Sequence, residues 1–154
     1  MMRQPRDDNY ERSNAVTTVR IGITTAARDL AARLLRSDGI EERQGLGEAL
    51  LDELADGAQV DICTLKVSDT RQYHRRVGGR TVFKQYGYYR PQSRYIYIQN
   101  RTAVRGQVLA PKSFLETMLH EWTHHYDFQV LKLRSIHTAG FYRRLRDLKE
   151  KLGI

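Results

Sequence analysis

Apolar residues recur at helical spacing in two stretches of the N-terminal half. Residues 23–36 and 46–56 carry Ala or Leu every three to four positions, which predicts two helices with one buried face each. Thr24 or Thr25 is expected to cap the first helix. A glycine follows soon after each stretch and is expected to end the helix. Neither helix carries a chemical motif, so both are predicted to support a sheet.

Two further amphipathic helices are predicted in the C-terminal third. The first follows Pro111, and Ser113 with Glu116 has the S-x-x-E spacing of a capping box. The second closes the chain. Their predicted core-facing residues are Leu115, Leu119, Trp122, Tyr126 and Val130 in the first, and Phe141, Leu145, Leu148 and Leu152 in the second.

Alternating apolar positions predict strands between these pairs of helices. Residues 60–67 alternate with Cys63, Leu65 and Val67 on one face. Residues 81–89 and 95–99 are predicted to form a hairpin around a turn at 91–93.

Three glycines in this strand-rich stretch are expected at turns or bulges. Gly78 and Gly79 indicate a turn before the hairpin, and Gly87 is expected to mark a bulge. The order of elements predicts an α+β fold in which a small, mainly antiparallel sheet packs against helices.

The length of 154 residues suits one domain with a substantial core. Residues 1–20 are expected to be a flexible N-terminal arm, and residues 21–154 a single domain. The N-terminus lacks the apolar core of a signal peptide and no apolar run is long enough to cross a membrane, so a cytoplasmic location is expected. The single Cys63 excludes an internal disulfide and is interpreted as a small buried hydrophobe.

Residues 120–124 read His-Glu-Trp-Thr-His, which is the H-E-x-x-H pattern. Two histidines four residues apart differ by about 40° around a helix axis, so His120 and His124 can hold one metal ion. Glu121 is then placed to take a proton from a metal-activated water. The alternative is a helix whose histidines are exposed or satisfied by hydrogen bonds.

A catalytic zinc usually has three protein ligands, so a third ligand is needed. His137 precedes the closing helix and is predicted to turn back toward the first pair. His74 is a second candidate without a supporting pattern. His125 points about 100° away from His124 and is a poor ligand. Asp127 is predicted to orient a ligand through a hydrogen bond rather than to bind metal directly.

This order of features resembles the SprT-like zinc metallopeptidases, which include the Spartan-type proteases. The matching residues are His120, Glu121, His124, His137 and Phe141. The resemblance implies a zincin-like fold whose metal site lies on the H-E-x-x-H helix and the following C-terminal helix. It also implies one Zn²⁺ per chain and cleavage of proteins, notably those crosslinked to DNA.

The resemblance extends over roughly residues 60–152, including the strand-rich stretch 94–100 before the metal helix. Many members of the family have Gly directly after the third histidine, where this chain has Thr138, with Gly140 two positions later. Many also carry a four-cysteine zinc ribbon, whereas this chain has one Cys. Contact with DNA would therefore have to come from elsewhere in the chain.

Charge is the second informative feature. The net charge is +8, yet residues 71–115 contain ten Lys or Arg and no acidic residue. This stretch is also rich in Tyr, and basic groups with aromatic side chains suit single-stranded or distorted nucleic acid. The predicted contacts are Arg75, Arg76, Arg80, Lys84, Tyr86, Tyr88, Arg90 and Arg94. The alternative is a strand-rich stretch whose Tyr and Arg serve sheet formation and solubility.

Two features of the closing helix have weaker signals. Tyr142 is a candidate donor to an oxyanion in the transition state. Arg143, Arg144 and Arg146 are interpreted as a solvated face.

Three functions remain open on these residues. The first is a zinc endopeptidase that acts on DNA-associated proteins. The second is a nucleic-acid-binding module with a structural zinc site, which would leave Glu121 without a purpose. The third is a regulatory protease with a dedicated protein substrate, in which the basic stretch binds acidic protein.

Overall fold

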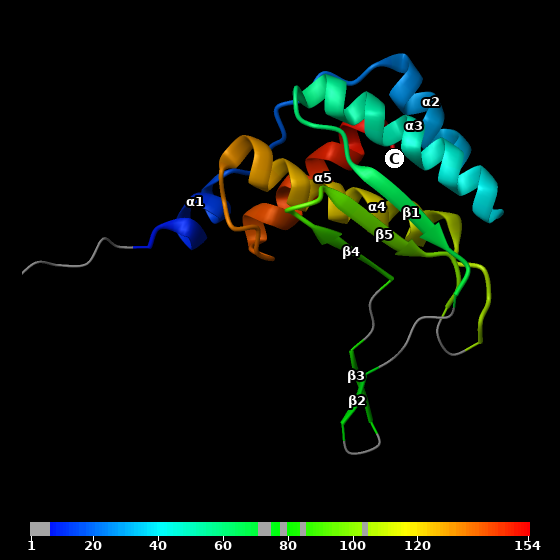
Figure 1. Ribbon diagram of the computed structural model, residues 1–154. Helices are drawn as coiled ribbons and strands as arrows, with labels where there is room; N and C mark the ends of the chain where they lie inside the picture. Colours follow the sequence, from blue (N-terminus) through cyan, green and yellow to red (C-terminus); the bar gives the residue numbers. More distant parts are fainter. Residues whose placement is uncertain (1–6, 71–74, 78–79, 84–85, 103–104) are drawn as a thin grey trace, which may run out of the picture.

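The computed structural model describes residues 7–70, 75–77, 80–83, 86–102 and 105–154 (Figure 1). These residues form an α+β fold of five α-helices, a three-stranded mixed sheet and a separate two-stranded ribbon. The helices are α1 (Asn9–Ala15), α2 (Thr25–Leu34), α3 (Ile40–Ala58), α4 (Pro111–Tyr126) and α5 (Ala139–Leu152), with a π-helical turn, η1 (Asp127–Leu131), continuing α4. The strands are β1 (Thr64–Ser68), β2 (Arg75–Val77), β3 (Arg80–Phe83), β4 (Gly87–Arg90) and β5 (Tyr95–Gln99).

The main sheet has the strand order β1-β5-β4. β5 pairs in parallel with β1 and antiparallel with β4, so the sheet is mixed and the expectation of a mainly antiparallel sheet is wrong. The β4–β5 hairpin turns at residues 91–94, close to the predicted 91–93, and Arg94 adopts φ 52° there.

The predicted strand 81–89 is divided between two sheets. Its first half, β3, pairs with β2, whereas its second half, β4, pairs with β5. The predicted turn at Gly78 and Gly79 lies outside the described residues. Gly87 pairs in register with Ile98, and the expected bulge is absent from this β4–β5 ladder. A Cβ at Gly87 would come within 2.6 Å of the Tyr97 carbonyl oxygen and 2.9 Å of Thr117 Cγ2, so glycine allows α4 to approach the strand closely.

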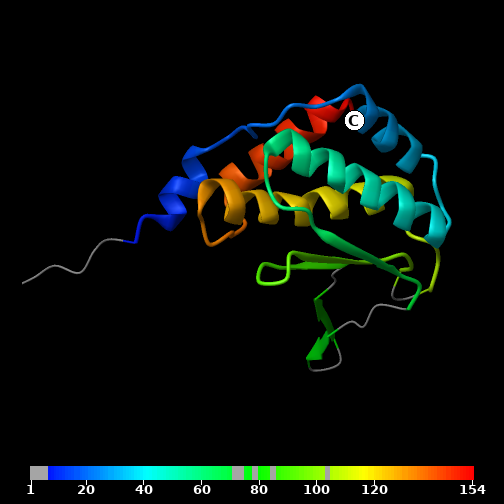
Figure 2. The ribbon, with the colours of Figure 1, turned by 45° about the horizontal axis from the view of Figure 1, so that its top comes forward.

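The core lies between the sheet and the helices that cover one of its faces (Figure 2). α3 packs on β1, while α4 packs on β4 and β5 and is covered in turn by α5. Leu65, Val67, Ile96 and Ile98 supply the inward positions of β1 and β5, and all are buried. The β2–β3 ribbon lies on the other side of the sheet (Figure 2).

The N-termini of α2 and α4 test the helix caps that were predicted from the sequence. Thr24 caps α2, because its side-chain oxygen accepts from the backbone N–H of Ala27 as predicted. α4 begins at Pro111 with Ala110 as its N-cap, so Ser113 lies inside the helix and the predicted capping box is wrong. Proline at the first helical position needs no N–H partner and already defines this start. Glu116 instead forms an ion pair with Lys149 of α5, at 2.6 Å.

Residues 7–20 differ from the expected flexible arm, whereas residues 1–6 of that arm lie outside the described residues. Residues 9–15 form α1, which packs against the start of α5. Val19 is 2% exposed and its N–H donates to Asp147 Oδ2 at 2.8 Å. The polar composition of this segment is explained by hydrogen bonds to distant residues, which sequence periodicity does not register.

Two smaller expectations concern burial and membranes. Cys63 is buried, and burial raises the pKa of its thiol to about 12, so it has the character of a small hydrophobe. Among the residues described, no helix combines the length and apolarity needed to cross a bilayer.

Candidate metal centre

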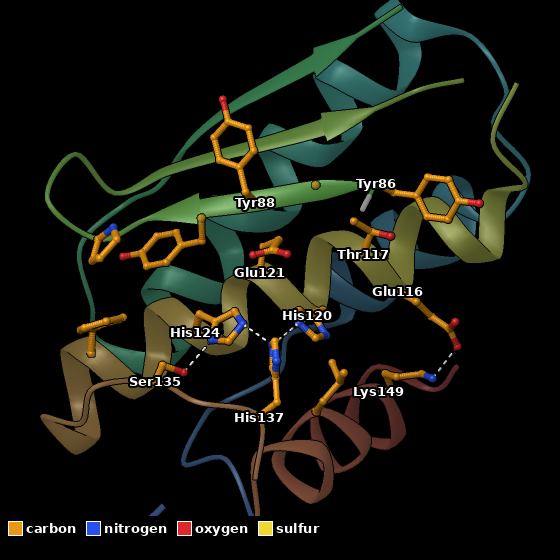
Figure 3. A pocket seen from close by; sticks show the side chains of 15 residues that line it. Tyr86, Tyr88, Glu116, Thr117, His120, Glu121, His124, Ser135, His137 and Lys149 are labelled. Atoms are coloured by element: carbon orange, nitrogen blue, oxygen red, sulfur yellow. Dashed lines mark hydrogen bonds and ion pairs between the residues drawn. The ribbon is translucent and has the colours of Figure 1, made fainter. Parts of the chain in front are cut away.

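Three histidines converge at the junction of α4 and α5 (Figure 3). His120 and His124 project from one face of α4, and His137 reaches them from the loop before α5. The Nε2 atom of His137 lies 3.0 Å from Nε2 of His120 and 3.0 Å from Nε2 of His124. The structure therefore brings together all three predicted ligands.

This arrangement of nitrogens fits a tetrahedral metal ion. All three ligand atoms lie within 4.8 Å of one another. Zn–N bonds of about 2.0–2.1 Å in a tetrahedron place two ligand nitrogens roughly 3.3 Å apart. A neutral imidazole nitrogen either donates or accepts, so the Nε2 of His137 cannot be correctly paired with both neighbours by one proton. A cation accepting all three lone pairs removes this conflict.

The tautomer of His124 is determined by its neighbours. Ser135 donates its hydroxyl proton to Asp127 Oδ2 at 2.8 Å. Its oxygen, 2.7 Å from His124 Nδ1, must then accept a proton from that nitrogen. With the proton on Nδ1, the Nε2 lone pair of His124 points at the cluster, as a metal ligand requires. The prediction that Asp127 orients a ligand is thus met through Ser135.

Asp127 is itself held by a buried ion pair. Arg144 donates to both carboxylate oxygens, at 2.9 and 2.8 Å, and both side chains are fully buried. The interpretation of Arg144 as part of a solvated face is therefore wrong, while Arg143 and Arg146 are exposed. Breaking such a pair typically costs about 3–5 kcal/mol, because it leaves an uncompensated buried charge.

Burial keeps His120 and His124 neutral. Loss of hydration, together with the neighbouring histidines, lowers the pKa of His120 to about 4 and the pKa of His124 to about 3. Both imidazoles are therefore unprotonated at neutral pH, which is the form that binds metal.

Glu121 has the properties of a poised base. It is 8% exposed, and burial raises the pKa of its carboxyl to about 7. Its carboxylate has no hydrogen-bond or ion-pair partner among the described residues. In Figure 3 it projects from α4 toward β4, beside the histidines. A carboxylate with its lone pairs unused, next to a candidate cation site, is suited to accept a proton.

The cluster opens into a pocket of about 730 Å³ between β4, α4 and α5. Its lining includes the apolar or aromatic residues Tyr89, Pro91 and Phe128 and the ion pair of Glu116 with Lys149. His137 is exposed, so the pocket gives access to the point where the three nitrogens converge.

Other candidates from the sequence lie outside the ligand set. His125 is buried, with Nδ1 2.6 Å from Tyr89 Oη and Nε2 2.7 Å from the Asp61 carbonyl oxygen, so it is a satisfied core histidine. Tyr126 is a core residue whose hydroxyl accepts from Arg20 N–H. His74 lies outside the described residues. The ring of Tyr142 lies 5.9 Å from that of His137, and its oxyanion role stays a prediction.

The residues predicted to contact nucleic acid lie in different parts of the structure. Arg75, Arg76 and Arg80 belong to the β2–β3 ribbon, for which the backbone is described, and Lys84 lies outside the described residues. Tyr86 packs against the core and lines the pocket, whereas Tyr88 points away from α4 (Figure 3). Arg94 pairs with Asp61 at 3.0 Å. The guanidinium of Arg90 lies 5.0 Å from the ring of Tyr88.

No family model, curated protein or solved structure matches the chain. The resemblance to SprT-like metallopeptidases therefore stays a prediction, and the candidate metal centre is supported by the geometry of its histidines. Sequence reasoning missed Ser135 and Arg144, because neither belongs to a short motif. The spacing of Ser135 two residues before His137 carries no distinctive signal by itself.

Proposed function

We propose that this protein is a zinc-dependent endopeptidase. The observation that supports it best is the convergence of His120, His124 and His137 beside Glu121 in an accessible pocket. A purely structural zinc is usually closed by a fourth Cys or His, and the described residues offer none within the cluster. A structural site also gives no role to a buried carboxylate without a partner.

In this proposal, separate residues of the chain hold the metal ion and transfer the proton during peptide hydrolysis. Zinc, when bound, supplies a Lewis acid that acidifies water and polarises the scissile carbonyl. His120, His124 and His137 would hold the ion, with Ser135 and Asp127 fixing the orientation of one ligand. Glu121 takes the proton of the attacking water and returns it to the leaving amine.

The main sheet offers a place for an extended substrate. β4 is an edge strand, pairs with β5 on one side, and contributes residues to the wall of the pocket. The opposite edge is occupied, because Gln44 of α3 donates to the Leu65 carbonyl at 2.8 Å and accepts from Val67 N–H at 2.7 Å. A peptide adding to β4 as a further strand would lie alongside the histidines. This favours unfolded or extended protein segments as substrates.

The proposed function is tested by metal analysis joined to a cleavage assay. The purified chain is expected to hold one zinc per molecule and to cleave an unfolded protein such as reduced casein. Removal of zinc by a chelator should abolish cleavage, and stoichiometric zinc should restore it. Zinc-loaded, folded protein without cleavage of any unfolded substrate would favour the nucleic-acid-binding module with a structural zinc. Absence of bound zinc at neutral pH would overturn the metal centre itself.

A nucleic-acid partner is favoured by the outward face of the sheet. The outward positions of the three strands carry no acidic side chain: Thr64, Lys66, Ser68, Tyr88, Arg90, Tyr95, Tyr97 and Gln99. Tyr88 stacks on Tyr97 with ring centroids 5.0 Å apart, and Arg90 lies over Tyr88. The β2–β3 ribbon, which carries Arg75, Arg76 and Arg80, lies on this side of the sheet (Figure 2). The face and the ribbon are together suited to phosphates and, once Arg90 moves aside, to unpaired bases.

Binding of a labelled single-stranded oligonucleotide is expected to weaken steeply between two salt concentrations, since each neutralised phosphate releases counterions. Replacing Arg75, Arg76, Arg80 and Lys84 together by Ala should lower affinity and flatten that salt slope. The matched control replaces four exposed arginines, which lie in helices or directly after one, by Ala: Arg33, Arg36, Arg143 and Arg146. Fluorescence anisotropy measures both.

Equal losses in the two quadruple variants would show that net charge alone governs binding. Tyr88→Ala should reduce affinity for single strands more than for duplex. No binding at low salt by folded protein would leave a peptidase whose basic surface serves an acidic protein substrate, the dedicated-substrate alternative.

A further inference from the structure

Helix α1 is joined by hydrogen bonds to the loop that carries His137. The Asn9 side chain donates to the Arg134 carbonyl and accepts from the Arg134 N–H, both at 2.9 Å. Arg12 donates to the carbonyl of Leu131 at 2.8 Å. Asn9 is 8% exposed, so its pair of bonds is largely shielded from water. The loop is thus fastened on the N-terminal side of His137.

The same helix fastens the loop on the other side of His137. Ser13 Oγ lies 2.8 Å from Thr138 Oγ1, and both side chains are buried. Gly140 N–H donates to Asn14 Oδ1 at 3.1 Å. A Cβ at Gly140 would lie 2.2 Å from the Ser13 carbonyl oxygen, so α1 and the start of α5 are in direct backbone contact. Thr138 follows His137 directly and caps α5, which ties the cap to α1.

A second connection runs from α1 to His124. Arg144 donates to the Ser13 carbonyl at 2.5 Å and to the Val16 carbonyl at 2.6 Å. The same guanidinium holds Asp127, which accepts from Ser135, whose oxygen bonds His124. Ser13 therefore contacts groups that act on two of the three candidate ligands.

The position of His137 depends on this scaffold. Its side chain is exposed, and its described ring contacts are to the other two ligands and to Phe141 and Tyr142 of α5. α1 spans seven residues without a side-chain cap, too short to persist as a helix by itself, so its order and that of the loop depend on each other.

We propose that α1 is a positioning element of the metal centre, which sets the zinc affinity of the folded protein by holding the His137 loop in its liganding position. This rests on the proposed zinc site. Docking of α1 reduces the freedom that the loop must lose when the ion binds, so an undocked α1 lowers affinity without altering any ligand. In this proposal α1 supports the metal site, although it supplies no ligand itself.

The test measures zinc affinity of the full chain by competition with a chromophoric chelator. Asn9→Ala removes both bonds to Arg134, and we expect affinity to fall by about tenfold, the lower end of the range for groups that support metal ligands. Arg12→Ala, an exposed change, should lower it by a smaller factor of about three. The matched control is Tyr10→Ala, on the same helix at a side chain 59% exposed, which should leave affinity within about twofold.

A purely stabilising role for α1 makes a different prediction. It would lower the unfolding temperature of the zinc-free variants but leave the affinity of the folded protein unchanged. Affinities are therefore measured at a temperature where circular dichroism shows each zinc-free chain to be folded. Wild-type affinity in folded Asn9→Ala or, if that variant does not fold, in Arg12→Ala would overturn the inference. A wild-type chain that binds no zinc would instead overturn the proposed function.

Discussion

Replacing Glu121 by Gln is expected to slow peptide cleavage by about 10²–10⁴-fold while zinc stays bound. The amide has the size of the carboxyl group but cannot accept the proton of the attacking water. Glu121 lies outside the ligand set, and its carboxylate has no described partner whose loss would destabilise the fold. Initial rates and zinc content measured on the same sample separate loss of the base from loss of the ion.

The pH profile gives this prediction a second readout. Burial raises the pKa of Glu121 to about 7, and a bound cation would lower it from there. Only the carboxylate accepts a proton, so the wild-type rate should rise with pH through that pKa. The residual rate of Glu121→Gln should lack this rise. A zinc-loaded variant with the wild-type rate and profile would exclude Glu121 as the base.

Glu116→Gln is the matched control for this change. Glu116 lies on the same helix and lines the same pocket, but it is paired with Lys149. Losing this partly exposed ion pair should cost little stability and leave the proton-transfer step intact. A rate loss equal to that of Glu121→Gln would show that any acidic residue in the pocket matters in the same way.

The convergence of the three candidate ligands was predictable because its information is local. Four-residue spacing on a helix places His120 and His124 on one face whatever surrounds them. The apolar stripe that begins at Phe141 predicted a second helix, and with it a return of the chain at His137. The supporting groups were not predictable in this way. Arg144 meets Asp127 across 17 residues and Ser13 across 131, so no sequence window contains the contact.

In the sheet, too, contacts between residues close in sequence were predictable and contacts between distant residues were not. The β4–β5 hairpin was predicted because Pro91 and its neighbours form a short turn between alternating segments. The pairing of β1 was not predicted, since β1 joins β5 in parallel across the intervening residues 69–94. The single predicted strand 81–89 became two, because alternation does not reveal which partner each half chooses. α1 was read as an arm because its contacts are polar and long-range.

Replacing His137 by Ala is expected to weaken zinc binding by more than about 100-fold, beyond the range seen when only a supporting group of a ligand is lost. Two ligands on one helix would remain, and the ion would have to complete its shell with water. His137 is exposed, so the change removes no core packing and the chain should stay folded. Chelator competition measures the affinity, and metal analysis after gel filtration measures retention.

The control for this change is Ile136→Ala. Ile136 precedes His137 in the same loop and is 41% exposed, so it reports on any general disturbance of that loop. It should retain zinc near the wild-type level. His125→Ala should lower stability, because it removes two hydrogen bonds of a buried side chain, yet leave zinc per folded molecule unchanged. Equal zinc affinity in wild type and His137→Ala would remove His137 from the ligand set, because the convergence of nitrogens would then have no bearing on binding.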